Sequence, residues 1–208
     1  MALVKYNNNS ISGITSAPNV GSGNITLIKT ITASSDSTIS FVDGSSDVVL
    51  DNTYPIYLFK LINIHPGTDN VHLQVNFSTN SGSNYNVTKT TTYFRAYHDE
   101  GAGGGVLAYD TGFDLAQSTA FHDLTADSVS TDNDYGVSGF IHLFDPSNTT
   151  FAKHFIANIQ SIKSGSSPES KNSYSTGYGN TTSAVDAIQF KFDSGNIDAG
   201  TIKMYGVA

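Results

Sequence analysis

The six histidines are the first candidates for acid–base or metal chemistry, and their spacing argues against both. They are His65, His72, His98, His122, His142 and His154. A helical zinc site places two histidines four residues apart beside a glutamate, and strand-borne sites often use a His-x-His pair. Neither pattern occurs, so we expect these side chains to be solvated or hydrogen-bonded in place.

A second candidate is the run His98-Asp99-Glu100, which joins an imidazole to two carboxylates ahead of the glycine-rich residues 101–105. A phosphate-binding loop would lead from a strand into a helix and would carry a lysine. This segment has neither feature. We therefore predict the tip of a hairpin.

Oxygen ligands concentrate at Asp127, Asp132, Asn133 and Asp134. Calcium prefers such ligands, but a helix–loop–helix calcium site needs them at alternate positions, with a central glycine and a late glutamate. We predict solvated turn residues here. A surface calcium ion is the alternative.

Paired carboxylates for sugar hydrolysis would have to stand on rigid strands about 5–10 Å apart. The only two glutamates, Glu100 and Glu169, fall in expected loops, and aspartates such as Asp43 and Asp145 begin turns. No Gly-x-Ser-x-Gly segment supplies a serine nucleophile. We predict a protein without enzymatic activity and without a cofactor or a bound metal.

Tyrosines offer a different chemistry, because their flat faces stack on sugar rings or on a partner protein. Tyr174 and Tyr178 stand beside Gly177 and Gly179 in an expected loop. They are the best candidates for ligand binding, although the absence of tryptophan weakens the case for a sugar platform.

The composition excludes several classes of function. The 208-residue chain contains no cysteine, which removes thiol chemistry and disulfides. Only 13% of its residues are charged, and a net charge of −8 without a basic run opposes binding to nucleic acid. We find neither a signal peptide nor a segment apolar enough to span a membrane, and predict no membrane partner.

Short runs of β-branched and aromatic residues, separated by Gly, Asp, Asn and Ser, predict a chain built of strands. By contrast, residues 101–105 and 164–178 read as long loops, and residues 111–125 show a helical period. Within residues 56–64 nearly every side chain is apolar, which predicts a central strand covered on both faces. The expected strands span residues 25–32, 38–42, 56–64, 71–77, 90–97, 106–109, 137–144, 151–162, 187–192 and 201–207.

These elements predict an all-β fold, an antiparallel β-sandwich of jelly-roll type with one short helix in a connection. We assign residues 25–208 to a single sandwich domain and residues 1–24, rich in Asn, Ser and Gly, to an extended N-terminal arm. Four apolar residues of the arm are expected to form an assembly interface with a neighbouring subunit: Val4, Tyr6, Ile11 and Ile14.

The C-terminal residues 194–207, SGNIDAGTIKMYGV, resemble the ending SGNIxxGTIxxYG of many small virion proteins from marine tailed phages. The opening MALVKYNNNSIS, Tyr54-Pro55 and the run Asn63-Ile64-His65-Pro66 are similar to segments of the same proteins. The resemblance implies a jelly-roll sandwich in a head-decoration, tail or fibre component. From the residues alone, a glycine-rich turn at 195–200 should deliver a last strand that pairs into the sheet.

We therefore expect a non-enzymatic virion structural protein, located in the virion, whose partners are other virion proteins and copies of itself. The first alternative is a lectin-like, receptor-binding module that recognises host-surface glycan through Tyr174 and Tyr178. A polysaccharide depolymerase comes third. The position on the particle, the copy number and the symmetry are not determined by the sequence.

Overall fold

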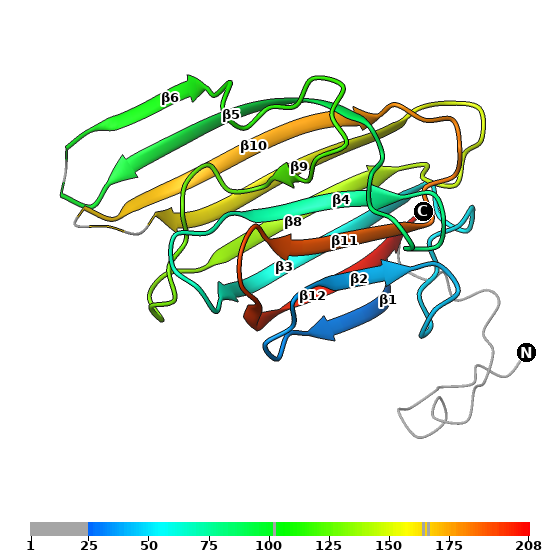
Figure 1. The fold of residues 1–208 in the computed structure, drawn as a ribbon, viewed down its shortest axis with the longest axis horizontal. Helices are drawn as coiled ribbons and strands as arrows, with labels where there is room; N and C mark the ends of the chain where they lie inside the picture. The colour runs from blue at the N-terminus through cyan, green and yellow to red at the C-terminus, as the bar shows by residue number, and fades with distance from the viewer. Residues whose placement is uncertain (1–24, 102, 164, 166) are drawn as a thin grey trace, which may run out of the picture.

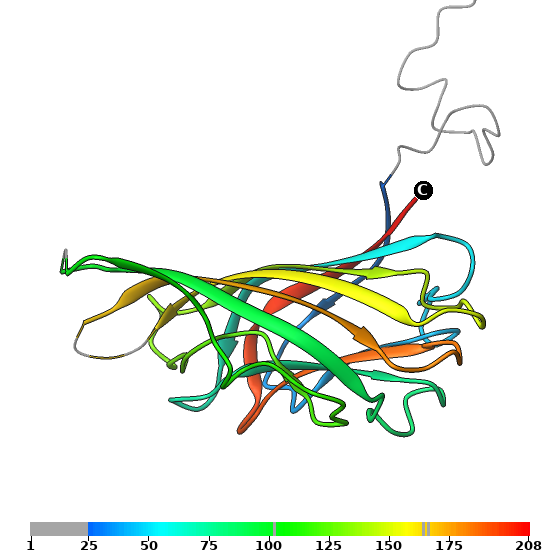
Figure 2. The same cartoon turned by 90° about the horizontal axis from the view of Figure 1, so that it is seen from above.

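The computed structural model describes residues 25–101, 103–163, 165 and 167–208, and these contain strands but no helix. Two antiparallel sheets pack face to face, as Figure 2 shows from above. The predicted all-β sandwich is confirmed at this level. The predicted arm, residues 1–24, lies outside the described residues.

The larger sheet has eight strands and the smaller has four. In spatial order the larger is β1 (Ile25–Thr32), β12 (Ile197–Val207), β3 (Ile56–Pro66), β8 (Val137–Phe144), β9 (Lys153–Lys163), β10 (Glu169–Gly179), β5 (Lys89–Asp99) and β6 (Gly105–Tyr109). The smaller is β2 (Ile39–Val42), β11 (Ala187–Phe192), β4 (Leu73–Ser78) and β7 (His122–Asp123). The smaller sheet does not cover the larger one completely, and β5 and β6 extend beyond it (Figure 1).

The core lies between the sheets and is built from the alternating apolar side chains of the strands. Phe41, Phe59 and Phe190 meet there with ring centroids 5.4 to 6.4 Å apart, and none of them exposes any surface. In β4 the alternation expected from the sequence places Val75 and Phe77 inside. Edge-to-face aromatic contacts of this kind add to the stabilisation from burial alone.

Three predicted strands, residues 25–32, 137–144 and 187–192, are found with the expected bounds. The largest error is β10, because its segment was expected to be a loop. Its sequence, ESKNSYSTGYG, lacks the apolar alternation of a strand. It forms a strand because β5 and β9 pair with it along all of its residues, so both sides of its backbone find partners.

The helix expected at residues 111–125 is not formed. The backbone of this segment is bonded to β5 instead: Thr91 N donates to Leu115 O at 2.9 Å, and Ser118 N and Lys89 O are 3.0 Å apart. Gln117 also has a positive φ of 49°, which a helix cannot contain. The segment ends in β7 and covers the inner side of β5 where the smaller sheet does not reach.

Within the described residues, another sheet covers the central strand β3 on one face only, which corrects the expectation from its sequence. Tyr57, Phe59 and Leu61 are buried in the core, whereas Lys60 and Ile62 on the opposite side are exposed. Leu58, on the same side, is 6% exposed because its neighbours shield it, but no other described element covers this surface of the larger sheet. This surface is the candidate site described below.

The last strand behaves as the sequence indicated, since β12 pairs with both β1 and β3. The turn before it contains Gly195 at φ 72°, and Gly200 at φ 114° lies where the register with β3 shifts. These backbone conformations favour glycine. Among the described residues there is also no helix that could cross a membrane.

Candidate binding face

The outer surface of the eight-stranded sheet, which we call the open face, is formed by every second side chain of its strands. Tyr93 and Phe155 point into the core, so their neighbours Phe94 and Ile156 point away from it. Large apolar side chains are exposed along this face, including Phe94 at 41% and Phe140 at 37%. Neighbouring exposed apolar groups of this size typically mark a contact surface.

Three rings in register across β6, β5 and β10 form what we call the aromatic band. Tyr109 pairs with Phe94, and Phe94 pairs with Tyr174. The rings of Phe94 and Tyr174 are stacked, with centroids 4.9 Å apart and an angle of 30° between their planes. Tyr109 is 54% exposed and its hydroxyl donates to Asp114 Oδ2 at 2.5 Å. The band therefore presents flat apolar surface with a polar rim.

A groove of about 380 Å³ lies beside the band on the open face. Short threonines form its floor, and Thr92 and Thr176 share a hydrogen bond of 2.9 Å between their hydroxyls. Larger side chains rise around them: Tyr178, His154 and Phe144 also line the groove. The hollow exists because the threonines of β5 and β10 stand next to large residues: Phe144 of β8, His154 of β9 and Tyr178 of β10.

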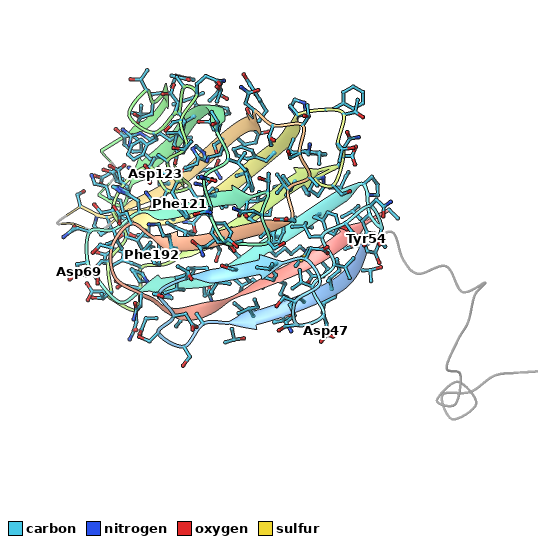
Figure 3. The ribbon with its side chains drawn as sticks, turned by 45° about the vertical axis from the view of Figure 1, so that its right-hand side comes forward. Asp47, Tyr54, Asp69, Phe121, Asp123 and Phe192 are labelled. Atoms are coloured by element: carbon cyan, nitrogen blue, oxygen red, sulfur yellow. The ribbon has the colours of Figure 1, made fainter. Side chains whose placement is uncertain are left out.

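The outer face of the four-stranded sheet differs in character. Gln189 Nε2 donates to Ser40 Oγ at 2.9 Å, and Gln74 Nε2 donates to Asp123 Oδ1 at 2.8 Å. Lys191 lies over the ring of Phe121, on the side of this sheet seen in Figure 3. This face is polar and internally bonded, in contrast to the open face of the larger sheet.

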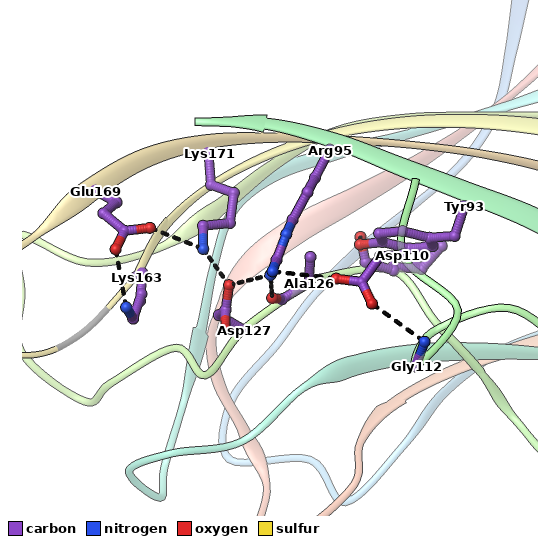
Figure 4. Close-up of polar contacts among 10 residues, drawn as sticks. Tyr93, Arg95, Asp110, Gly112, Ala126, Asp127, Lys163, Glu169 and Lys171 are labelled. Atoms are coloured by element: carbon purple, nitrogen blue, oxygen red, sulfur yellow. Dashed lines mark hydrogen bonds and ion pairs between the residues drawn. The ribbon is translucent and has the colours of Figure 1, made fainter. Parts of the chain in front are cut away.

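Behind the aromatic band, an ion network holds the connecting segment against β5 and β10 (Figure 4). Asp127 accepts from Arg95 at 2.7 Å and from Lys171, whose side chain is only 2% exposed. Arg95 also pairs with Asp110 at 3.2 Å. Because each of these charged side chains is paired with an opposite charge, we interpret the network as stabilising the fold.

Glu169 closes this network at the start of β10. Its carboxylate lies 2.9 Å from both Lys163 and Lys171. Burial works to raise the pKa of Glu169, but the hydrogen bonds from the two lysines lower it below its usual value. Glu100, the other glutamate, is exposed in the β5–β6 connection. The backbone N–H of Glu100 donates to the carbonyl oxygen of Pro168 at 3.0 Å, so the two glutamates lie near each other at one end of the sheet, where the two lysines engage Glu169.

A second group of buried polar residues lies between the sheets beneath β5. Lys89 is fully buried and donates to Asn76 Oδ1 at 2.5 Å and to Val87 O at 2.8 Å. Burial lowers the pKa of Lys89 to about 7. Nearby, burial and the charge of Lys89 lower the pKa of His122 to about 3, and the Nε2 of His122 has no hydrogen-bond partner among the described residues.

The predicted ligand-binding tyrosines do lie on one surface. Tyr174 belongs to the aromatic band and Tyr178 lines the groove, both on the open side of β10. They are half-buried residues of a strand, which corrects their placement in a loop. The predicted interface residues lie outside the described residues, so the structure does not place them: Val4, Tyr6, Ile11 and Ile14.

The remaining histidines are dispersed over the molecule. His142 and His154 lie on the open face, and burial lowers the pKa of His142. His72 lies 3.3 Å from Asp193, and His98 Nδ1 lies 2.8 Å from the carbonyl oxygen of Asp99. Within the part of the chain that the structure describes, no three His, Asp or Glu residues form a group that could hold a metal ion.

The two acidic loops also have local roles. The segment after His98 is the connection of the β5–β6 hairpin, as predicted, and Asp99 accepts hydrogen bonds from Gly101 N and from Ser167 Oγ. Asp132 and Asp134 are exposed to solvent. The carboxylate of Asp127 is paired with Arg95 and Lys171, so it is not available to bind a calcium ion together with Asp132 and Asp134.

Phe94 and Tyr109 were not singled out from the sequence, although both belong to the aromatic band. A signal existed, since Thr90, Thr92 and Phe94 alternate along one side of a predicted strand. Their importance depends on β10, which places Tyr174 next to Phe94. Comparison of the chain with protein-family models, with curated proteins and with solved structures finds no match.

Proposed function

We propose that the protein is a non-enzymatic structural subunit of a tailed-phage virion, a head-decoration, tail or fibre component that works in many copies. In this proposal the open face is a contact surface with neighbouring subunits. The single observation that carries the proposal is a sheet face that exposes large apolar side chains and that no other described element covers. The polar clusters elsewhere in the fold are engaged in internal bonds.

The strand order supports a jelly roll, the fold implied by the resemblance. In a jelly roll, eight strands form two four-stranded sheets. Here β1-β12-β3-β8 faces β2-β11-β4-β7, and along the chain each strand of this set is followed by one in the opposite sheet, except that β4 and β7 are neighbours in the smaller sheet. The hairpins β5–β6 and β9–β10 are then additions that widen one sheet. Jelly rolls are frequent in viral capsids and in lectins.

The segments that carry the resemblance contact one another. Tyr54 packs over Gly206, and Gly200 lies against the backbone of Asn63 with no room for a β-carbon. Pro66 and Ile197 are paired in the β3–β12 ladder. The shared residues thus form one structural unit of the framework, which supports a common fold and assigns no reactive group.

The size and chemistry of the open face support a protein partner. Leu27, Ile62, Phe94 and Phe140 come from four different strands, and each is 37% to 51% exposed. Aromatic residues such as Phe94 and Phe140 are typical of the centres of protein interfaces. A subunit held in an assembly would cover these side chains, which would otherwise favour nonspecific association.

The test is whether the chain is a regular part of the particle. Gradient-purified particles of the phage that encodes it would be analysed by quantitative mass spectrometry and by labelling with an antibody against the chain. We expect many copies per particle and regular antibody positions in electron micrographs. Absence from particles, with the chain recovered only in the cleared lysate, would overturn the proposal.

A glycan-binding module is the second candidate, favoured by the stack of Phe94 on Tyr174 and by the hydroxyl-lined groove at Tyr178. Aromatic faces next to hydroxyl groups suit the two sides of a sugar ring. A glycan array separates the two functions. Saturable binding that Tyr178→Ala abolishes and Phe151→Ala, on the β8–β9 connection, preserves would favour the lectin; no saturable ligand would leave the structural role.

A further inference from the structure

The strand β6 is an edge of the larger sheet that lacks protection against pairing with another strand. It pairs with β5 on one side only, in regular register from Gly105 to Tyr109. Val106 is 43% exposed and Leu107 is 73% exposed. Its sequence, GVLAY, contains no lysine, no proline and no bulge. Proteins normally place such features on edge strands to prevent strand addition.

The other sheet edges have this protection. The opposite edge of the larger sheet, β1, carries Lys29 and has a register shift between Leu27 and Lys29. In the smaller sheet the edges are β2, with four residues, and β7, with two. Short edge strands offer little backbone for pairing. β2 also keeps Ile39 and Phe41 buried in the core, so β6 is the described edge strand that lacks lysine, proline and a bulge and still exposes large apolar side chains.

The free backbone groups of β6 can be assigned from its ladder with β5. Asp110 N donates to Tyr93 O at 3.0 Å, just beyond the pair of Tyr109 with Phe94. In an antiparallel ladder, bonded residues alternate along the strand. Ala108 and Val106 therefore bond to β5, whereas Leu107 directs its N–H and C=O outward, away from the sheet. An added strand would bond to Leu107.

The charges near β6 argue against pairing with a second β6. Asp99 and Glu100 precede it, and Asp114 is bonded to Tyr109 at its other end. Antiparallel self-pairing would bring the acidic ends of two copies together, and like charges in register are destabilising. A suitable partner strand is apolar and carries neutral or positive charge.

Residues 1–24 of the chain meet this requirement, since Lys5 is their only charged side chain. Val4 and Tyr6 are two residues apart, so on an extended strand both point to one face. Ile11 and Ile14 are three apart and cannot do so. The segment with strand character is thus the one around Val4 and Tyr6.

We propose that the segment Leu3–Tyr6 of a second copy adds to β6 as a ninth strand, with Val4 and Tyr6 extending the aromatic band. This inference rests on the proposed function, in which copies of the chain contact one another, and it identifies β6 as the strand to which the neighbouring copy binds. β1 and β6 are opposite edges of the sheet, so the nearest β6 to a chain entering at Ile25 is that of a copy placed beside β1. Residues 7–24 can extend to about 60 Å, more than the sheet width of about 34 Å, so they are long enough for either β6, and the trapping experiment below distinguishes a second copy from the same chain.

Disulfide trapping in the full chain tests the contact directly, because the protein has no native cysteine. A Leu107→Cys protein is mixed, under oxidising conditions, with proteins that carry a single cysteine at position 3, 4, 5 or 6. Non-reducing gels and mass spectrometry measure the cross-linked heterodimer. We expect Val4→Cys and Tyr6→Cys to give several-fold more heterodimer than Leu3→Cys and Lys5→Cys, because alternate residues share a face.

Two backbone variants provide the matched control. Each is introduced into the Tyr109→Cys protein and mixed with the same arm variants. Leu107→Pro removes the outward N–H without removing a bond to β5, and edge strands tolerate proline at such positions. Leu107→Thr keeps that N–H. Cross-linking should be lost with proline and kept with threonine, while circular dichroism of both variants matches the parent protein.

The other outcomes are each decisive. Equal yields at positions 3 to 6, or no heterodimer at all, contradict strand addition by the arm. A cross-linked homodimer of the Leu107→Cys protein alone means that β6 pairs with itself, and an internal disulfide in monomeric Val4→Cys/Leu107→Cys means that the arm binds its own chain. If these results occur while the chain is abundant in particles, only this inference fails. Absence of the chain from particles is the separate failure of the proposed function.

Discussion

The ring of Tyr54 lies directly over the α-carbon of Gly206, at the end of the last strand, where any β-carbon would overlap the ring. The two residues are far apart in the sequence and belong to two different segments of the resemblance to virion proteins. The edge of the Tyr54 ring also meets Tyr57, with centroids 5.9 Å apart. Glycine at position 206 is thus required by packing against Tyr54.

The first prediction concerns this contact. Gly206→Ala should lower the free energy of unfolding by about 1–3 kcal/mol, as overpacking of a filled site does. Urea denaturation followed by circular dichroism measures the change. Gly67→Ala is the control, because a β-carbon there would meet nothing closer than 3.7 Å. Tyr54→Ala combined with Gly206→Ala should cost less than the sum of the two changes; strict additivity would mean that the ring does not set the requirement.

The second prediction concerns the ion network behind the aromatic band. Asp127→Ala should destabilise the protein by about 3 kcal/mol, because it leaves Arg95 and the buried Lys171 without their shared carboxylate. Lys163→Met, which removes a 37% exposed partner of Glu169, should cost less than about 1 kcal/mol. Equal losses for the two variants in urea denaturation would show that burial does not distinguish the pairs.

The third prediction is a rise in stability with pH between about 7 and 10. The pKa of Lys89 is lowered by burial to about 7, so over this range the unfolded chain binds a proton that the folded chain does not. Stability must then increase with pH, by up to about 1.4 kcal/mol per pH unit. Lys89→Met should remove this contribution, because methionine does not titrate. Asn76 Oδ1 keeps a hydrogen bond in this variant, since it also accepts from Phe77 N at 2.8 Å.

Guanidinium denaturation of the two proteins at pH 7.0 and 9.5 tests the third prediction. The quantity of interest is the difference between the parent protein and Lys89→Met, because Lys153 also has a pKa lowered by burial and contributes equally to both. A difference that does not change with pH would contradict the assignment to Lys89.

The fourth prediction is an acid-induced loss of stability through His122. Burial, aided by the charge of Lys89, lowers the pKa of His122 to about 3. Below pH 6.5, the usual pKa of histidine, the unfolded chain therefore binds a proton that the folded chain does not bind. The free energy of unfolding falls as the pH falls toward 3. Between pH 7 and 4.5 the loss should be about 2–3 kcal/mol. Thermal unfolding of His122→Phe should lack this part of the loss.

The same experiment contains its control. Asp51, Asp69 and Asp99 have pKa values lowered by hydrogen bonds, so they too reduce stability on acidification, equally in both proteins. His122→Phe keeps an aromatic ring between Tyr93 and Phe155. If the two proteins lose stability in parallel from pH 7 to 4.5, His122 is not the group responsible.

Much of the architecture is a local property of the sequence. The β-branched and aromatic alternation in residues 25–32, 137–144 and 187–192 fixes strands with their bounds, because the pattern of each strand matches the two-residue period of a half-buried sheet. The same logic places Val75 and Phe77 in the core. The alternation does not say which face is left uncovered, since an apolar run such as residues 56–64 suits a covered and an open sheet equally.

What the sequence alone determined is therefore the class, an all-β chain of two facing sheets. Only the tertiary structure decided that Tyr174 and Tyr178 lie on a strand, that residues 111–125 bond to β5 instead of forming a helix, and that Phe94 joins Tyr174 on an open face. The physical reason is that these outcomes depend on neighbours distant in the chain. A polar segment such as β10 becomes a strand when β5 and β9 satisfy its backbone from both sides, and no local pattern records that.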